Sequence, residues 1–141
     1  MTAKEYLKQI QNLHTKIENK RERLERIDCI LTSPAVGEIK QDKVQTSIKL
    51  DKQERLIVDK ADLEDELQRL MYEEAVLIIN IGRQIDGMDN PLYSRILHLR
   101  YEDFLSLWLI AQRINYSYPH TKRLHGQALL EFDKMYLQDC V

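Results

Sequence analysis

The sequence has 141 residues, of which 43% are hydrophobic and 31% are charged, and its formal net charge is −2. No apolar run is long enough to cross a bilayer and the N-terminus lacks the apolar core of a secretory signal, so we expect no membrane partner and a cytosolic protein. A chain with this negative total is a poor general polyanion binder, so any affinity for nucleic acid must come from a local patch.

The first 32 residues follow a heptad pattern typical of a coiled coil. Two core positions recur every seven residues. The first holds Ala3, Ile10, Ile17, Leu24 and Leu31, and the second holds Tyr6, Leu13, Lys20 and Ile27, of which Lys20 is the one charged residue. The pattern predicts a long helix that ends before Pro34. It then dissolves around Pro34 and Gly37, which predicts a loop over about residues 33–51.

A second long helix is predicted from about Lys52 to Gln84. Its core positions again recur every seven residues: Leu56, Leu63, Leu70 and Leu77, with Lys60, Leu67, Glu74 and Ile81 as companions. Folding this helix back on the first buries both stripes, so residues 1–86 are predicted to form an antiparallel, coiled-coil-like helical hairpin.

One hairpin cannot bury every apolar side chain of the second helix. Four isoleucines lie off its main stripe: Ile57, Ile78, Ile79 and Ile85. Either the C-terminal residues pack on the hairpin or two hairpins pair. We expect a homodimer, combined with some packing of the C-terminal residues.

A small C-terminal domain is predicted over residues 90–139. Asn90 is the expected N-cap of its first helix, with Pro91 in the first turn, where a missing N–H costs nothing. The whole chain is therefore predicted to be all-α, with a long N-terminal hairpin followed by this small domain.

Two short helical patterns in this domain flank the turn Asn115-Tyr116-Ser117. Ser106 is predicted to cap the first helix and Ser117 the second, because a serine hydroxyl accepts hydrogen bonds from the free N–H groups of a helix start. Asn115 is expected to adopt the left-handed conformation, which asparagine tolerates better than most residues. Together these signals predict a helix-turn-helix.

The second helix of this unit has two contrasting faces. Thr121, Leu124 and Ala128 share the inward face, with His125 at its edge. The opposite face holds hydrogen-bond donors and aromatic rings without an acid: Tyr118, His120, Lys122, Arg123, Gly126 and Gln127. Such a helix can enter a DNA major groove. The candidate DNA-binding residues are Tyr118, His120, Lys122, Arg123 and Gln127, with Arg113 from the preceding helix.

This unit resembles the promoter-reading domain of sigma factors. It matches that pattern without gaps at Leu99-Arg100-Tyr101, Leu105-Ser106, Ile110-Ala111, Arg113, Ser117, Lys122 and Ala128-Leu129. With the opening Met1-Thr2-Ala3-Lys4-Glu5-Tyr6-Leu7, the acidic helical middle and Arg123-Leu124-His125-Gly126, the chain is similar to the ArpU/RinA-like phage transcriptional regulators of Gram-positive hosts. The resemblance implies a phage-encoded, sequence-specific DNA-binding regulator of late genes that acts in the bacterial host cytoplasm, with double-stranded DNA as partner and host RNA polymerase as a candidate partner.

Trp108 and Leu109 depart from the family pattern, which has polar residues there. We expect them to pack against the protein's own long helices, because an exposed tryptophan lowers solubility. The alternative is a docking surface for a second protomer or for RNA polymerase. In that case the unit is a degenerate sigma-like module without base readout, and the protein is an adaptor or inhibitor of a host factor.

No catalytic, metal or cofactor site is expected. The abundant carboxylates of the second helix are typical of a solvated helix face. The four histidines and two cysteines lack metal-ligand spacing, and there is neither a glycine-rich phosphate loop nor a Ser/His/Asp signature. We therefore do not expect an enzyme.

Overall fold

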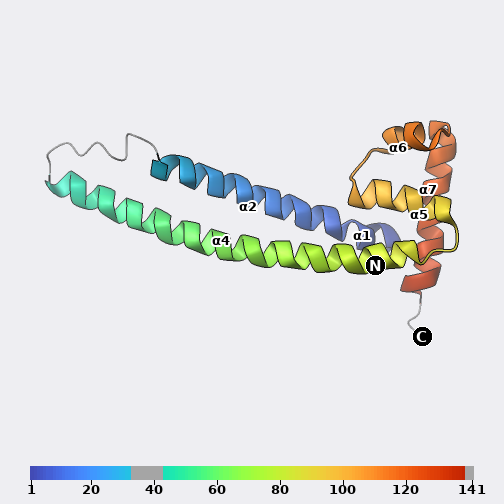
Figure 1. Cartoon of the computed structure of the whole chain (residues 1–141), viewed down its shortest axis with the longest axis horizontal. Helices are drawn as coiled ribbons and strands as arrows, with labels where there is room; N and C mark the ends of the chain where they lie inside the picture. The colour runs from blue at the N-terminus through green and yellow to red at the C-terminus, as the bar shows by residue number, and fades with distance from the viewer. Residues whose placement is uncertain (33–42, 139–141) are drawn as a thin grey trace. The chain divides into compact units, whose positions relative to one another are not determined.

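The computed structural model describes residues 1–32 and 43–138, and for residues 43–50 the backbone alone. Its helices are α1 (Ala3–Leu7), α2 (Gln9–Thr32), α4 (Lys43–Asp86), α5 (Pro91–Leu97), α6 (Leu107–Ile114) and α7 (Tyr118–Phe132) (Figure 1). Single π-helical turns follow α5 at His98–Glu102 and α7 at Asp133–Leu137. The described residues contain no strand, and the predicted all-α fold is confirmed.

The predicted heptad register of the first helical stretch is confirmed. Its core positions are buried or half-buried from Ala3 to Leu31, and α2 ends at Thr32, before Pro34. The stretch begins with a capping box, in which the Thr2 hydroxyl accepts from the Glu5 N–H and the Glu5 carboxylate accepts from the Thr2 N–H.

Helix α4 begins at Lys43, earlier than predicted. The loop predicted over about residues 33–51 is therefore wrong for 43–51, whereas residues 33–42 lie outside the described part. Residues 43–51 contain neither glycine nor proline, and each residue added to an existing helix gains one backbone hydrogen bond. The apolar pattern of these residues is weak and predicted a loop, but their sequence can continue a helix.

The chain divides into two compact units, a central unit (Thr15–Glu73) and a terminal unit (Met1–His14 with Glu74–Val141). In the central unit, α2 and α4 lie side by side and antiparallel (Figure 1). Their stripes bury Ile17, Ile27, Leu63 and Leu70. Ion pairs connect the two helices beside this core, between Lys20 and Glu66 at 2.8 Å and between Lys60 and Asp28 at 2.7 Å.

The terminal unit has a core built from both ends of the described chain. Its buried members are Ala3, Leu7, Ile10, Ile81, Ile85, Met88, Leu97, Tyr101, Ala128 and Phe132. The Tyr6 and Phe132 ring centres lie 5.9 Å apart, and the Tyr6 hydroxyl donates to the Gln84 side chain at 2.7 Å. The C-terminal residues thus pack on the first and last turns of the predicted hairpin. This packing buries Ile85 and leaves Ile57, Ile78 and Ile79 exposed.

The predicted border at residues 86–90 coincides with the junction of α4 and α5. The compact units divide the chain elsewhere, because Met1–His14 and the residues from Glu74 onward belong with α5, α6 and α7. None of the described helices is long and apolar enough to span a membrane.

Candidate nucleic-acid interface

A second small core holds the helix-turn-helix in place. It joins Ile96 and Leu99, from α5 and the following turn, to Ile110 of α6 and Leu124 of α7. Helix α5 begins as predicted, since the Asn90 side chain accepts from the Leu92 N–H at 2.9 Å. The position of α7 is therefore set by buried apolar contacts with two preceding elements.

The turn between α6 and α7 has the predicted local structure. The Ser106 hydroxyl accepts from the Leu109 N–H and the Ser117 hydroxyl accepts from the His120 N–H, both at 3.3 Å. Asn115 ends α6 in the left-handed conformation, at φ 60° and ψ 39°. Three short-range signals thus fix the start of α7.

The inward face of α7 is buried as predicted. Thr121, Leu124 and Ala128 are buried, and the Thr121 hydroxyl donates to the Ser117 carbonyl at 2.9 Å, so its polar atom is satisfied. His125 is half-buried and shares a 2.9 Å hydrogen bond with the Tyr101 hydroxyl.

The His125 and Tyr101 side chains are uncharged at neutral pH. Burial lowers the pKa of His125 to about 4, with smaller contributions from the positive charges of Arg100 and Lys4. Burial likewise raises the pKa of Tyr101 to about 12. At neutral pH the positive charge of α7 is therefore confined to its outward side.

The outward face of α7 exposes most of the predicted site residues. Tyr118, Lys122, Arg123 and Gln127 are exposed, as is Arg113 on α6. The Lys122 Nζ atom lies 5.3 Å from the centre of the Tyr118 ring, a cation–π contact. No acidic residue occurs between Arg113 and Leu130, so this surface has a local positive charge.

Two of the predicted site residues also take part in contacts within the protein. His120 is half-buried, and its ring meets the edge of Tyr116 at 5.1 Å between centres. The Gln127 carbonyl oxygen accepts from the Tyr93 hydroxyl at 3.0 Å. That bond fixes the Gln127 amide and leaves its NH₂ group as a donor for a partner.

Leu130 lies on the same side of α7, and the sequence analysis did not include it among the candidate site residues. It is 64% exposed and lies one turn after Gly126. The spacing of four residues from Gly126 was the available signal. The outward face therefore ends in an apolar side chain that a partner could cover.

The expected packing of Trp108 and Leu109 against the long helices is wrong. Trp108 is 56% exposed and Leu109 is also exposed. Helix α6 turns Ile110 and Ala111 inward, and at 100° per residue the two preceding positions fall on its other side. The alternative of a docking surface stays open.

His98 forms a cluster that the sequence analysis did not anticipate. Its Nε2 atom lies 2.6 Å from Asp86 Oδ1 and its Nδ1 atom 2.9 Å from Glu102 Oε2. Burial alone lowers the pKa of His98, but the hydrogen bonds to Asp86 and Glu102 outweigh burial and raise it. The spacing of four residues to Glu102 was visible in the sequence, whereas the contact with Asp86 depends on the fold.

We expect the stability of the protein to fall as pH rises through the raised pKa of His98. The stabilisation from charged His98 is fully present below the ordinary histidine pKa of 6.5 and disappears when the folded protein loses this proton. Thermal melts of wild type and His98→Gln across this pH range measure the effect. The decline should be absent in His98→Gln and retained in the control His120→Gln; an equal decline in all three proteins would contradict it.

The described residues contain no group of three or more His, Cys, Asp and Glu side chains that could hold a metal ion. Cys29 is exposed and has a free thiol, and Cys140 lies outside the described residues. Comparisons with models of known protein families, with curated proteins and with solved structures found no match. The case for a function therefore rests on the chain's own geometry.

Proposed function

We propose that the protein is a sequence-specific DNA-binding transcriptional regulator that places α7 in the major groove. The observation that carries the proposal is the exposed, acid-free side of α7, on a helix whose start is fixed by Asn115 and Ser117. Following the resemblance to ArpU/RinA-like proteins, we extend the proposal to a phage regulator of late genes in the bacterial host cytoplasm. It acts by binding and not by catalysis.

Different side chains of this surface suit different parts of DNA. The Arg123 guanidinium can donate two hydrogen bonds to guanine, and the Gln127 NH₂ group can donate to an acceptor on a base edge. Lys122 and Arg113 carry charges suited to phosphates, which fix the position of the protein without reading sequence. Base-reading and phosphate-holding groups thus occupy one surface.

Gly126 supports a close approach to this surface. A glycine inside a helix costs about 1 kcal/mol relative to alanine. Inside this protein nothing requires it, because a Cβ atom at Gly126 meets no described atom within 4 Å. A partner that contacts the helix backbone there would account for glycine at this position.

Gly126→Ala is therefore expected to affect stability and binding in opposite directions. The free energy of unfolding should rise by about 0.5–1 kcal/mol. Affinity for double-stranded DNA should fall, on the order of tenfold, because the added methyl group separates α7 from the groove. Denaturant unfolding and fluorescence anisotropy measure the two quantities. A more stable variant with unchanged DNA affinity would mean that no DNA approaches α7 at Gly126.

The direct test of the proposal is a titration of the full chain with pooled double-stranded DNA of random sequence at two salt concentrations. Phosphate contacts release counterions, so the logarithm of the association constant should fall linearly with that of the salt concentration. Selection from the same pool should enrich a defined sequence. Absence of binding at low salt would reject DNA as the partner.

The exposed Trp108 and Leu109 favour a second candidate function. A tryptophan on a free helix surface is a typical anchor of a protein interface, and the exposed Leu109 beside it extends the apolar surface. In this candidate, α6 docks on a host factor such as RNA polymerase, and the protein is an adaptor or inhibitor without base readout. The two functions differ in the helix where substitutions should reduce binding, which is α7 for DNA and α6 for a protein partner.

Trp108→Ala is expected to leave stability within about 0.5 kcal/mol of wild type, because the side chain is largely exposed. If the second candidate function holds, the variant loses binding to purified host RNA polymerase and keeps its DNA affinity. Surface immobilisation of the polymerase and thermal melting provide the two measurements. Equal polymerase binding by wild type and variant would exclude Trp108 as an anchor.

A further inference from the structure

A continuous groove runs along one side of the central unit. Three clefts follow one another along α4, beginning near Asp51 and ending near Leu70, and neighbouring clefts share lining residues. Asp59 lines both the first and the middle cleft, and the middle and last clefts share Lys20, Arg23 and Glu66. Six of the α4 residues that line them are spaced by three or four positions, as expected for one side of a helix: Asp51, Arg55, Asp59, Asp62, Glu66 and Arg69.

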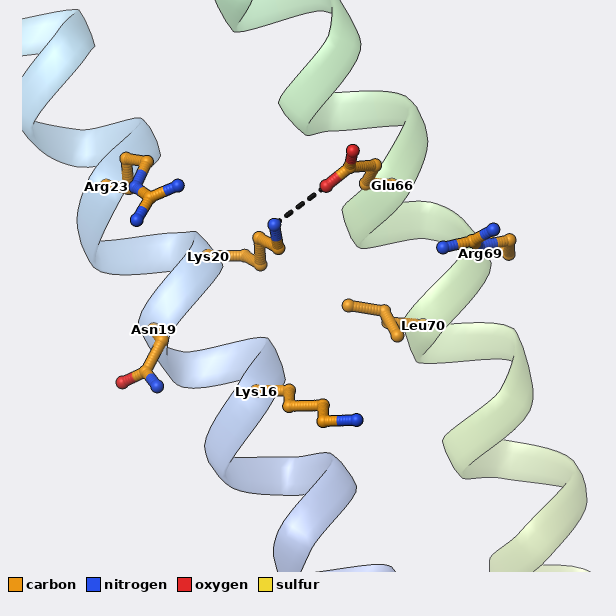
Figure 2. Close-up of a pocket in the computed structure, with 7 residues that line it drawn as sticks. All are labelled: Lys16, Asn19, Lys20, Arg23, Glu66, Arg69 and Leu70. Atoms are coloured by element: carbon orange, nitrogen blue, oxygen red, sulfur yellow. Dashed lines mark ion pairs between the residues drawn. The ribbon is translucent and has the colours of Figure 1, made fainter.

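The charge of this groove changes sign along its length. The acidic end is lined by Asp51, Glu54, Asp59 and Asp62 together with Arg55, and the cleft that Asp62 lines is also lined by Lys20 and Arg23 of the basic end. The basic end is a cleft of about 410 Å³ lined by Lys16, Lys20, Arg23 and Arg69, with Glu66 as its one acid. Figure 2 shows Lys16 and Lys20 of α2 directed into the space between the two helices.

Most of these charges form no ion pair with a residue that the structure describes. Lys20 pairs with Glu66 at 2.8 Å, as the dashed line in Figure 2 marks. The pKa of Glu66 is lowered first by that hydrogen bond and charge, and then by the charges of Arg69 and Arg23, which indicates a local positive potential. At the acidic end, Asp59 and Asp62 form no ion pair with any residue that the structure describes, and the same holds for Lys16, Arg23 and Arg69 at the basic end.

Each end of the groove also has an exposed apolar side chain on the same side of α4. Val58 lines the acidic end and is 58% exposed, and Tyr72, close to the basic end, is 72% exposed. They lie about four helical turns apart, which returns them to nearly the same angle around the helix. Two apolar side chains this far apart do not form one patch, so the charges of the groove carry the argument.

We propose that a second copy of this chain covers the groove in an antiparallel arrangement about a two-fold axis. The axis brings the acidic end of one copy against the basic end of the other, twice per dimer. It also places Val58 of each copy near the partner's Tyr72. The opposed charges specify the antiparallel orientation, because a parallel pairing puts like charges together. This inference does not depend on DNA binding.

Sedimentation of the full chain tests the proposal with two charge-reversal variants. Lys16→Glu/Arg69→Glu reverses the basic end, and Asp59→Lys/Asp62→Lys reverses the acidic end. Wild type should dimerise at about 50 mM salt and weaken at about 500 mM. Each variant alone should dimerise at least tenfold more weakly, since both of its contacts become repulsive. An equimolar mixture should recover the dimer, because all contacts in the mixed pair are again complementary.

The control variant Arg26→Glu/Arg83→Glu makes the same change in net charge as Lys16→Glu/Arg69→Glu, at exposed positions that do not line the groove. It should dimerise like wild type. A monomeric wild type at low salt, or two reversed variants that dimerise normally, would overturn the proposal. So would a mixture that fails to recover the dimer, which is the result expected if the basic end instead holds phosphate groups of a ligand. Circular dichroism of each variant verifies that the helices are intact.

Discussion

Lys122→Ala/Arg123→Ala is expected to weaken DNA binding by about two orders of magnitude while the melting temperature stays nearly unchanged. Both side chains are exposed on α7, and neither forms an ion pair with a described residue, so their removal leaves the fold intact. A bidentate arginine–guanine contact contributes about 1–3 kcal/mol of discrimination, and a phosphate contact adds affinity for every sequence. Anisotropy titrations at fixed salt measure the loss.

The two single variants should differ in kind. Arg123→Ala is expected to relax sequence preference at one base pair, whereas Lys122→Ala should weaken all sequences and reduce the salt slope by about one. Arg83→Ala removes the same charge from an exposed position on α4 and should have little effect on either quantity. Unchanged affinity in both α7 variants would remove this helix from the interface.

Phe132→Ala is expected to cost about 3–5 kcal/mol of unfolding free energy, the usual range for deleting a buried aromatic ring. Phe132 is fully buried, and its ring centre lies 5.9 Å from that of Tyr6 and 4.9 Å from that of Tyr136. The cavity therefore opens in the core shared by the two ends of the chain. Chemical denaturation followed by circular dichroism measures the loss.

Leu130→Ala is the matched control for this prediction. Leu130 lies on the same helix two residues earlier and is mostly exposed, so its truncation should cost less than about 1 kcal/mol. Similar small losses in the two variants would show that α7 does not depend on the N-terminal residues for its packing.

The local structure of the helix-turn-helix was predictable because its signals act over a few residues. A serine that caps a helix bonds to an N–H three residues on, as Ser106 and Ser117 do. An asparagine that ends a helix needs only its own conformation, as at Asn115. The buried stripes of α2 and α4 were likewise predictable, since a heptad pattern fixes which side of a helix is apolar.

The exposure of Trp108 and the surroundings of Ile85 were not predictable in the same way. Both depend on which distant element covers a given side of a helix. That a residue is hydrophobic does not tell whether such an element packs on it. Ile85 found cover in the terminal core, whereas Trp108 lies on the side of α6 away from the second small core. The start of α4 was misplaced for another reason, because a polar sequence without glycine or proline fits a loop and a helix equally well.

The core that joins Ala3 and Leu7 to Ala128 and Phe132 also sets the order of events in folding. The first of these residues leaves the ribosome long before the last has been synthesised. Ile81 and Ile85 of α4 can cover part of the N-terminal segment early, but the part that packs on α7 stays uncovered until α7 is made. Contacts between residues this far apart in sequence form slowly, because closing a long loop costs entropy before the contact repays it. A ribosome stalled before α7 should therefore hold a chain that binds chaperones, and release of α7 should end that binding.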